Sequence, residues 1–385
     1  PIPQGERPAA LGTIWYPYLP SPDARPVLKA VLVDEEGRRW GEGERTIDLG
    51  LTIPRYFAGP RLQDLHLSPD GTSFIADIGA EQVQSYWVDP SLGEVKSIVP
   101  NVKEARFLAW GTGHRILALV LVGPGGLDKQ GRSVWLADLN TQEYREVLFP
   151  VSEYGFLLSH AFAFSPDGSW IADAAVYGPT PSHEGSDIEI ALQPSAGGER
   201  ATLAVFHIPE EAVVLRLTWS PNGQNLALSF LTEIHDADSP PYYKGHLWLI
   251  DKDSGGHTVL VHDLYLTMDW SPDGRYIAFL RERDPTQRKS AIDLWLFDSA
   301  TSSEIQLTAY TDRRVTSAVW SPDGHRLAFA VTVEIGDSIE GYDKIGDYGE
   351  IWMTSLDGKE QYPVAGPTAP DAPVAWLPAA KGGQK

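Results

Sequence analysis

Short segments in which apolar and polar residues alternate follow one another along the whole chain. Residues 215–219 read apolar, charged, apolar, polar, apolar, which is the two-residue period of a half-buried strand. A second such segment follows after a tight turn, as in residues 276–280, then a third that ends in aspartate (294–298) and a fourth (304–308). No stretch of useful length has the 3.6-residue period of a helix. The pattern predicts an all-β protein.

A short turn sequence recurs between the first and second strand of each unit. It consists of an apolar or aromatic residue followed by Ser-Pro, then Asp or Asn, then Gly. Proline fixes φ at the first corner, and Asp-Gly or Asn-Gly closes a tight turn. Four short antiparallel strands in a unit that repeats every ~50 residues are typical of a β-propeller blade. Five full copies, a degenerate copy and a truncated copy lie at residues 67–71, 164–168, 219–223, 270–274, 320–324, 110–113 and 376–378.

The two ends of the chain complement each other. Residues 373–378 read as a first strand that stops at its turn, and residues 12–50 contain three further strand candidates. Joining them removes exposed sheet edges. We therefore predict a seven-bladed β-propeller of four-stranded antiparallel blades in a single domain, 1–385; the alternative is six blades plus an N-terminal extension. The expected blades are 62–100, 102–150, 160–206, 214–263, 266–310, 315–366, and the composite 373–378 with 12–50.

The repeat resembles the TolB-like (WD40-like, Ser-Pro-Asp-Gly) propeller repeat of bacterial envelope proteins, and the resemblance covers nearly the whole chain. It implies the fold and is not specific for one function. We expect an extracytoplasmic location, either periplasmic, cell-surface or secreted, with a leader that is not present in this chain.

Composition removes several classes of function. The chain has 52 acidic and 31 basic residues, a net charge of −21, so a globally basic nucleic-acid binder is excluded. It has no cysteine, which excludes disulfides, zinc–thiolate sites and cysteine nucleophiles. The longest apolar run, residues 116–122, is too short to span a bilayer.

Tryptophans recur at fixed positions of the unit. Repetition at the same position favours packing between blades over a carbohydrate platform. Trp15, Trp40 and Trp170 fall outside these positions and are candidates for a surface role. The recurring residues are Trp110, Trp219, Trp270, Trp320 and Trp376 in first strands, and Trp135, Trp248, Trp295 and Trp352 in third strands.

Several catalytic motifs are missing from the sequence. It contains no Gly-x-Ser-x-Gly elbow, no His-Glu-x-x-His and no phosphate-binding loop. Residues 251–256 resemble the start of a calcium loop, but position twelve is His262, so an ordinary turn is favoured.

Long insertions between second and third strands are the candidate binding loops. The loop 334–350 carries six acids and one lysine, with interleaved tyrosines. A solvated acidic loop is the alternative. A divalent cation such as calcium is the cofactor that mixed nitrogen and oxygen ligands in the neighbouring loops would hold, although scattered polar loop residues are favoured. The binding candidates are Asp337, Glu340, Tyr342, Asp343, Asp347, Tyr348, Tyr242 and Tyr243; the metal candidates are His183, Glu184, Asp187, His235, Asp236 and Asp238.

We expect a non-catalytic propeller that binds or scaffolds proteins in an envelope or surface assembly, rather than an enzyme. The acidic balance favours a protein partner with a basic surface, and no nucleic acid. The alternative is a metal-dependent polysaccharide lyase or hydrolase with its site at the channel mouth, since seven-bladed oligogalacturonate lyases have similar repeats. An acidic protein is a poor match for a polyanionic sugar.

Overall fold

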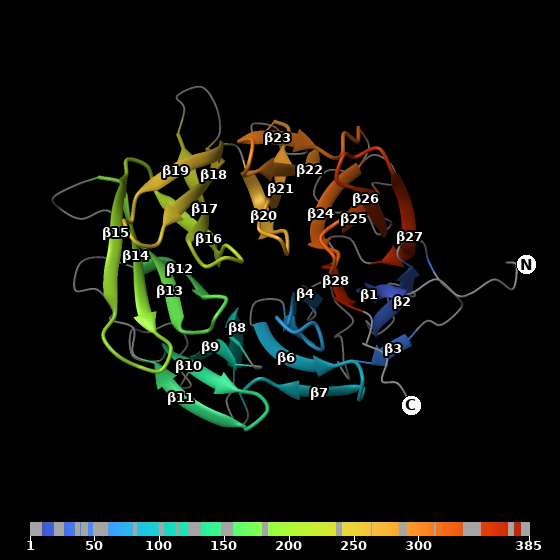
Figure 1. Cartoon of the computed structure of the whole chain (residues 1–385), viewed down its shortest axis with the longest axis horizontal. Helices are drawn as coiled ribbons and strands as arrows, with labels where there is room; N and C mark the ends of the chain where they lie inside the picture. The colour runs from blue at the N-terminus through green and yellow to red at the C-terminus, as the bar shows by residue number, and fades with distance from the viewer. Residues whose placement is uncertain are drawn as a thin grey trace, which may run out of the picture. The chain divides into compact units, whose positions relative to one another are not determined.

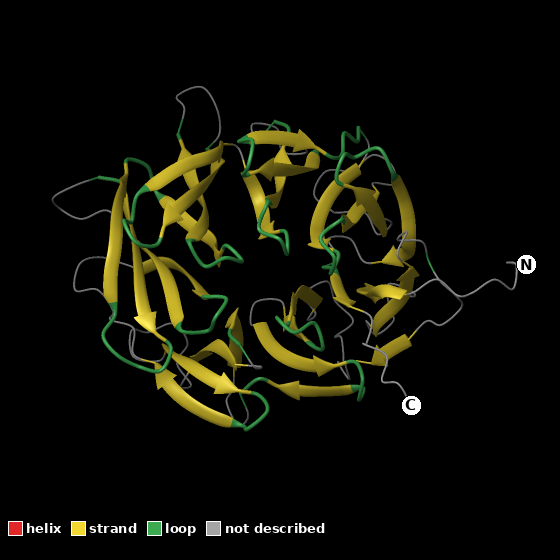
Figure 2. Cartoon of the chain, viewed as in Figure 1, coloured by secondary structure: helices red, strands yellow, loops and turns green. Residues whose placement is uncertain are grey.

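The protein is all-β over the residues that its computed structural model describes (Figures 1 and 2). Twenty-eight strands form seven four-stranded antiparallel sheets, and no helix occurs in these residues, so none of them could cross a membrane as a helix. The predicted seven-bladed β-propeller is confirmed. The described residues are 10–18, 27–34, 39, 45–48, 61–79, 83–99, 104–112, 115–121, 132–147, 157–178, 184–235, 241–262, 264–284, 291–311, 313–333, 348–368 and 373–378.

Six of the sheets take four consecutive strands each, and the seventh combines both ends of the chain. In order along the chain, the six are β4 (Arg61–Leu67), β5 (Phe74–Gly79), β6 (Val83–Asp89) and β7 (Glu94–Ser97); β8 (Glu104–Trp110), β9 (Arg115–Leu121), β10 (Arg132–Asp138) and β11 (Glu143–Val147); β12 (Leu157–Phe164), β13 (Trp170–Tyr177), β14 (Ser186–Pro194) and β15 (Ala201–Ile208); β16 (Ala212–Trp219), β17 (Asn225–Ile234), β18 (Tyr242–Asp251) and β19 (His257–His262); β20 (Leu264–Trp270), β21 (Tyr276–Glu282), β22 (Ile292–Asp298) and β23 (Ser303–Gln306); β24 (Arg313–Trp320), β25 (Arg326–Val333), β26 (Tyr348–Ser355) and β27 (Gln361–Thr368).

The contacts divide the chain into two compact units. The first comprises Pro1–Glu81, Tyr86–Lys96 and Tyr310–Lys385, and the second comprises Gln82–Ser85 and Ser97–Ala309. The expectation of a single domain over 1–385 stays a prediction.

The composite sheet of the first unit has the order β28 (Ala375–Pro378), β1 (Ala10–Tyr18), β2 (Val27–Asp34) and β3 (Arg45–Asp48). Thr13 of β1 lies opposite Leu377 of β28, so the C-terminal strand pairs with the N-terminal one as predicted. Trp15 and Trp376 are 1% and 0% exposed and belong to the apolar cores on the two sides of this sheet. The prediction that Trp15 is free for a surface role is therefore wrong.

The other tryptophans follow their strand positions. Trp219, Trp270 and Trp320 are buried at 6–8% exposure, which confirms packing for these first-strand residues. The third-strand residues, such as Trp248, are half-buried. Trp170 is exposed and Trp40 lies outside the described residues.

The recurring turn is held by its serine and aspartate. The hydroxyl of Ser165 donates to Asp167 Oδ1 at 2.5 Å and accepts the backbone N–H of Trp170 at 3.0 Å. These bonds lower the pKa of Asp167 to about 2. Gly168 has φ +71°, which a residue with a Cβ rarely adopts. The same bonds recur at Ser355–Gly358, where leucine replaces proline, so the serine and aspartate rather than the proline define the turn.

Candidate functional site

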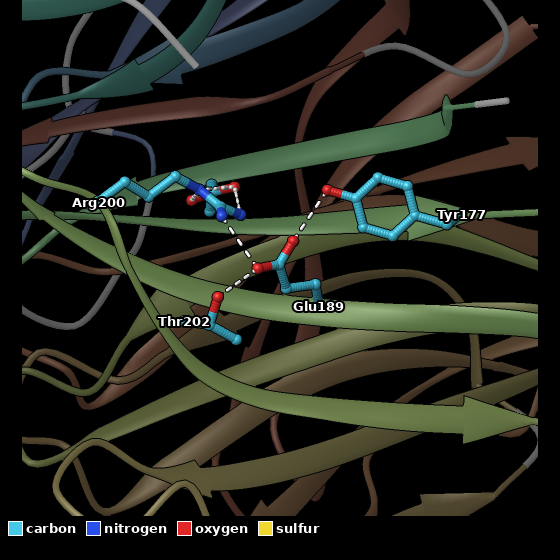
Figure 3. Close-up of polar contacts among 5 residues, drawn as sticks. Tyr177, Glu189, Arg200 and Thr202 are labelled. Atoms are coloured by element: carbon cyan, nitrogen blue, oxygen red, sulfur yellow. Dashed lines mark hydrogen bonds and ion pairs between the residues drawn. The ribbon is translucent and has the colours of Figure 1, made fainter. Parts of the chain in front are cut away.

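A network of charged and hydroxyl side chains crosses one face of the sheet β12–β15 in the second unit (Figure 3). Asp173 and Tyr177 belong to β13, and Glu189 belongs to β14. Arg200 directly precedes β15, and Thr202 is the second residue of that strand. Three adjacent strands therefore each contribute to one cluster.

Strand alternation and register place these side chains together. Asp173 and Tyr177 are four residues apart in β13, so they point to the same face. Glu189 lies opposite Ala175, midway between them along β13. Ala174 and Val176, which alternate with these positions along β13, are fully buried on the other face. One sheet thus presents a polar face and an apolar face.

The guanidinium of Arg200 is the centre of the network. Its Nε donates to Asp173 Oδ1 at 2.9 Å, and its Nη2 donates to Asp173 Oδ2 at 2.8 Å. Its Nη1 donates to Glu189 Oε1 at 3.0 Å. The side chains of Asp173 and Arg200 are only 1% and 11% exposed. Such a bidentate pair has one well-defined geometry.

Burial and charge act against each other on these groups. Burial alone would lower the pKa of Arg200, but hydrogen bonds and charges from Asp173 and Glu189 outweigh it and raise that pKa, so the guanidinium stays charged. Burial raises the pKa of Asp173, and Arg200 opposes this shift. Arg200 therefore opposes the effect of burial on both carboxylates of the cluster.

Glu189 accepts hydrogen bonds from side chains of both neighbouring strands. Tyr177 Oη donates to its Oε2 at 2.8 Å, and Thr202 Oγ1 donates to its Oε1 at 2.5 Å. Burial by itself would raise the pKa of Glu189, but hydrogen bonds from Arg200, Thr202 and Tyr177 outweigh it and lower that pKa. Burial, followed by the bond to Glu189, raises the pKa of Tyr177. At neutral pH, Glu189 is a carboxylate and Tyr177 a phenol.

A neutral histidine lies on the same face. His160 of β12 is opposite Ala175 of β13, and its ring centre is 5.4 Å from that of Phe162. Burial lowers the pKa of His160 to about 4; the positive charge of Arg200 adds to this and Glu189 opposes it. The imidazole is therefore uncharged at pH 7, next to an ion cluster.

The polar face continues outward to Asp187 and His207. Asp187 of β14 lies opposite both Tyr177 and His207. His207 Nδ1 is 3.0 Å from Asp187 Oδ1, and their side chains are 53% and 30% exposed. The buried part of the network fixes charges in place, and this outer pair is its solvent-accessible end.

The predicted metal ligands are only partly within the described residues. Glu184 is exposed, Asp187 contacts His207, and the exposed His235 lies 3.6 Å from Glu233. In the ranges that the structure describes, no group of three or more His, Cys, Asp or Glu side chains is placed to hold a metal ion. The remaining candidates, His183, Asp236 and Asp238, lie outside those ranges.

The predicted binding residues are likewise divided. Tyr242 is half-buried and Tyr243 is 54% exposed at the start of β18, where they lie opposite Ile234 and Glu233. Tyr348 opens β26 opposite Val333, and its side chain is outside the described set. The other five candidates, Asp337, Glu340, Tyr342, Asp343 and Asp347, lie outside the described residues.

The segment 251–256, which resembles the start of a calcium loop, forms an ordinary turn. Asp251 Oδ1 accepts the backbone N–H and the hydroxyl of Ser254, both at 2.8 Å, and these bonds lower the pKa of Asp251. Gly255 has φ +66°, and a Cβ there would lie 2.6 Å from the carbonyl oxygen of Leu203. The turn thus uses its aspartate to hold its own backbone.

Sequence reasoning missed Arg200 and its partners. A usable signal was present in β13, where Asp173 interrupts a run of small apolar residues. A charged residue inside such a strand requires a buried partner. The partner could not be identified without the register of β14 and β15.

Comparison with known proteins finds a match to a curated protein over part of the chain. No protein-family model matches the chain. A curated relative, "Uncharacterized peptidase YuxL" of Bacillus subtilis (strain 168), is 27% identical over 128 residues, which are 33% of this chain and 18% of that protein. The chain therefore matches less than a fifth of this relative's length.

Solved structures share the fold at low sequence identity. Among prolyl endopeptidases, one structure has a TM-score of 0.58 and 12% identity over 97% of this chain and 50% of its own. A puromycin hydrolase has a TM-score of 0.55 and 16% identity over 94% and 54%. The oligogalacturonate lyase of Vibrio parahaemolyticus has a TM-score of 0.52 and 11% identity over 93% and 86%. These likenesses show the propeller fold.

The expectation of a non-catalytic scaffold that is not an enzyme is wrong. The relative is named a peptidase, and the proteins that share the fold include endopeptidases, a hydrolase and a lyase. These proteins are named as enzymes, so the comparisons overturn the expectation. A propeller repeat carries no catalytic signature, so a search for motifs within the chain could not reveal these likenesses.

Proposed function

We propose that this chain is the propeller part of a hydrolase that cleaves peptide or amide bonds. The observation that carries the proposal is the match to the Bacillus subtilis peptidase over 128 residues. The prolyl endopeptidase and puromycin hydrolase likenesses support it, because 97% and 94% of this chain correspond to only 50% and 54% of those proteins. The aligned region therefore makes up about half of each of those two proteins.

The catalytic nucleophile in this proposal comes from outside the 385 residues. The sequence holds no Gly-x-Ser-x-Gly elbow and no cysteine. In the prolyl endopeptidases, inter-domain dynamics have a role in catalysis and specificity. The propeller here has the corresponding role: it is a rigid partner whose position relative to the catalytic part controls which substrates enter. The Arg200 network suits this role, because it fixes three strands of one blade to one another.

The TolB-like assignment and the extracytoplasmic location belong to the same proposal. The Ser-Pro-Asp-Gly turns support the assignment, and cell fractionation with an antibody to the propeller tests the location.

The experiment uses the native polypeptide that contains these residues, captured from its source cells with that antibody. A fluorophosphonate probe, which labels activated serines, is expected to modify the captured polypeptide and to leave the isolated 385-residue chain unmodified. Peptide mapping locates the label. A captured polypeptide that resists the probe and cleaves no peptide or amide substrate contradicts the proposal, as does lyase turnover by the isolated chain.

A further inference from the structure

Asn222 occupies the aspartate position in one copy of the recurring turn. Ser220 Oγ donates to Asn222 Oδ1 at 2.7 Å, and the backbone N–H of Gln224 donates to the same oxygen at 3.0 Å. Five other turns have aspartate at this position, and each aspartate accepts the same two hydrogen bonds. The turn of Asn222 is therefore built like its counterparts, although it lacks their charge. Those aspartates are Asp70, Asp167, Asp273, Asp323 and Asp357.

The aspartate turns show what a negative charge does at this position. The bond from Ser165, followed by bonds from Ser169, lowers the pKa of Asp167 to about 2. The bond from Ser271 likewise lowers the pKa of Asp273. The donors of the turn thus favour an ionised carboxylate. We expect the donors to position 222 to favour a carboxylate in the same way.

Asn222 is followed by the residue that least hinders attack on its side chain. Asn222 is exposed, and Gly223 has φ +68°. Because glycine has no Cβ, its backbone nitrogen can approach the side-chain carbonyl of the preceding asparagine with the least steric hindrance. The other three asparagines, Asn101, Asn140 and Asn225, are followed by valine, threonine and leucine. Position 222 is therefore the asparagine at which the backbone can most easily attack.

The hydrogen bonds of the turn act on both partners of such an attack. Ser220 Oγ and the N–H of Gln224 polarise the Cγ carbonyl of Asn222, and they stabilise negative charge that develops on its Oδ1. The backbone N–H of Gly223 donates to the carbonyl oxygen of Ser220 at 2.8 Å, so this bond must open before the nitrogen can attack. The turn therefore activates the carbonyl and restrains the nitrogen, which makes the reaction slow.

We propose that Asn222 is a site of spontaneous deamidation, which converts it to the aspartate found in the other turns. The nitrogen of Gly223 loses its proton to hydroxide and bonds to Cγ of Asn222, the Cγ–Nδ2 bond breaks, and ammonia leaves after protonation by water. Water then adds to Cγ of the cyclic imide and breaks the bond from Cγ to the nitrogen of Gly223, which regains a proton. This modification goes beyond the proposed hydrolytic function and does not depend on it.

The surroundings of the turn favour normal aspartate over isoaspartate. The donors to Oδ1 polarise Cγ rather than the backbone carbonyl, and addition of water at Cγ keeps the original peptide bond. Isoaspartate would instead add a carbon to the backbone and shift Gly223. A Cβ on Gly223 would lie 3.7 Å from Cδ of Pro166, and one on Gly274 would lie 3.4 Å from Cδ of Pro221, so the turns of three successive sheets lie close together. Such a shift would disturb the neighbouring turns.

The test incubates the folded 385-residue chain at mildly alkaline pH and follows each asparagine by peptide mapping with mass spectrometry. Asn222 is expected to convert at least about tenfold faster than Asn140. Asn140 is the matched control, since it is also exposed and lies in the turn between β10 and β11. The rate should rise with pH, because the attacking nitrogen must lose its proton. Asn222→Gln should stay unmodified, because its longer side chain would have to close a larger ring.

Two further measurements test the product. A synthetic peptide of residues 219–225 lacks the fixed turn, and the folded chain is expected to give a larger share of aspartate over isoaspartate than this peptide. Asn222→Asp, which makes the product directly, is expected to melt about 1–2 °C higher than the unmodified chain at neutral pH. Because the turn lowers the pKa of its aspartate, this gain should be lost as pH falls through the pKa of the folded carboxyl group.

Three results would overturn the proposal. The first is conversion of Asn222 that is no faster than that of Asn140. The second is a share of aspartate in the folded chain that is no larger than in the peptide. The third is a melting temperature of Asn222→Asp at or below that of the unmodified chain at neutral pH, since the product would then not suit the turn.

Discussion

The two faces of the sheet β12–β15 are stabilised by different interactions, although the same strands supply both. On one face Ala174, Ile188 and Ile190 are fully buried and pack in a core with residues of β16 and β17. On the other face Arg200 connects Asp173 and Glu189. Apolar burial adds up roughly by area, so each residue contributes on its own. A buried ion cluster works only as a whole, because a single missing partner leaves an uncompensated charge.

The largest effect is expected from Arg200→Met. The buried carboxylate of Asp173 and the half-buried carboxylate of Glu189 would lose their cation, at a cost of about 3–5 kcal/mol in the free energy of unfolding. Urea unfolding measures it. The control is Arg115→Met, since Arg115 is 51% exposed and 3.8 Å from Asp138, and it should cost less than about 1 kcal/mol. Equal costs for the two variants would show that the cluster is not held by Arg200.

On the apolar face, Ile190→Ala is expected to cost about 3 kcal/mol through lost burial and a residual cavity. Because no charge is involved, the cost should be the same at pH 5 and pH 8. Val205→Ala is the control on the neighbouring strand, where the side chain is exposed, with an expected change below about 0.5 kcal/mol. A strong pH dependence of the Ile190→Ala cost would remove the distinction between the faces.

His160 sharpens the comparison through pH. Its pKa is about 4 in the folded protein and 6.5 in the unfolded chain, so the unfolded state binds more protons between these values. Stability from this group is fully present above pH 6.5 and is lost as pH falls toward 4, by about 2–3 kcal/mol. His160→Gln should flatten this part of the unfolding free energy against pH. Parallel curves for the two proteins would contradict the burial of a neutral imidazole.

The smallest effect is expected at the rim of the network. Thr202→Val removes the hydroxyl that donates to Glu189 while keeping the shape, and should cost about 1 kcal/mol because Thr202 is exposed. Thermal unfolding can resolve it. A loss as large as that of Arg200→Met would place the centre of the network at Glu189 instead.

The sequence predicted the blades and the composite sheet, but it did not predict the Arg200 network. The blades followed from local signals, since each Ser-Pro-Asp-Gly turn holds itself with its own serine and aspartate. The composite sheet followed from an unfinished first strand at 373–378 and unpaired strands near the N-terminus. The Arg200 network did not follow, because its bonded partners lie as far as 27 residues apart and meet only through the registers of β13, β14 and β15.

The functional error had a different origin. Catalytic motifs were sought within the chain, whereas the expectation of a non-catalytic scaffold was overturned by the names of a relative and of proteins that share the fold. The Asp187–His207 pair illustrates why contacts between distant residues escape a motif search. Asp187 was noted as a metal candidate, but its partner His207 lies across the sheet, 20 residues on, and only the strand register joins them.

The most direct test of the hydrolase proposal is the turnover rate of the captured native polypeptide on a panel of substrates. The panel contains proline-containing peptides, aminoacyl amides and oligogalacturonate. We predict cleavage of peptide or amide bonds that is abolished by fluorophosphonate treatment, and no turnover of the oligosaccharide. Turnover of oligogalacturonate without peptide or amide cleavage would contradict the account.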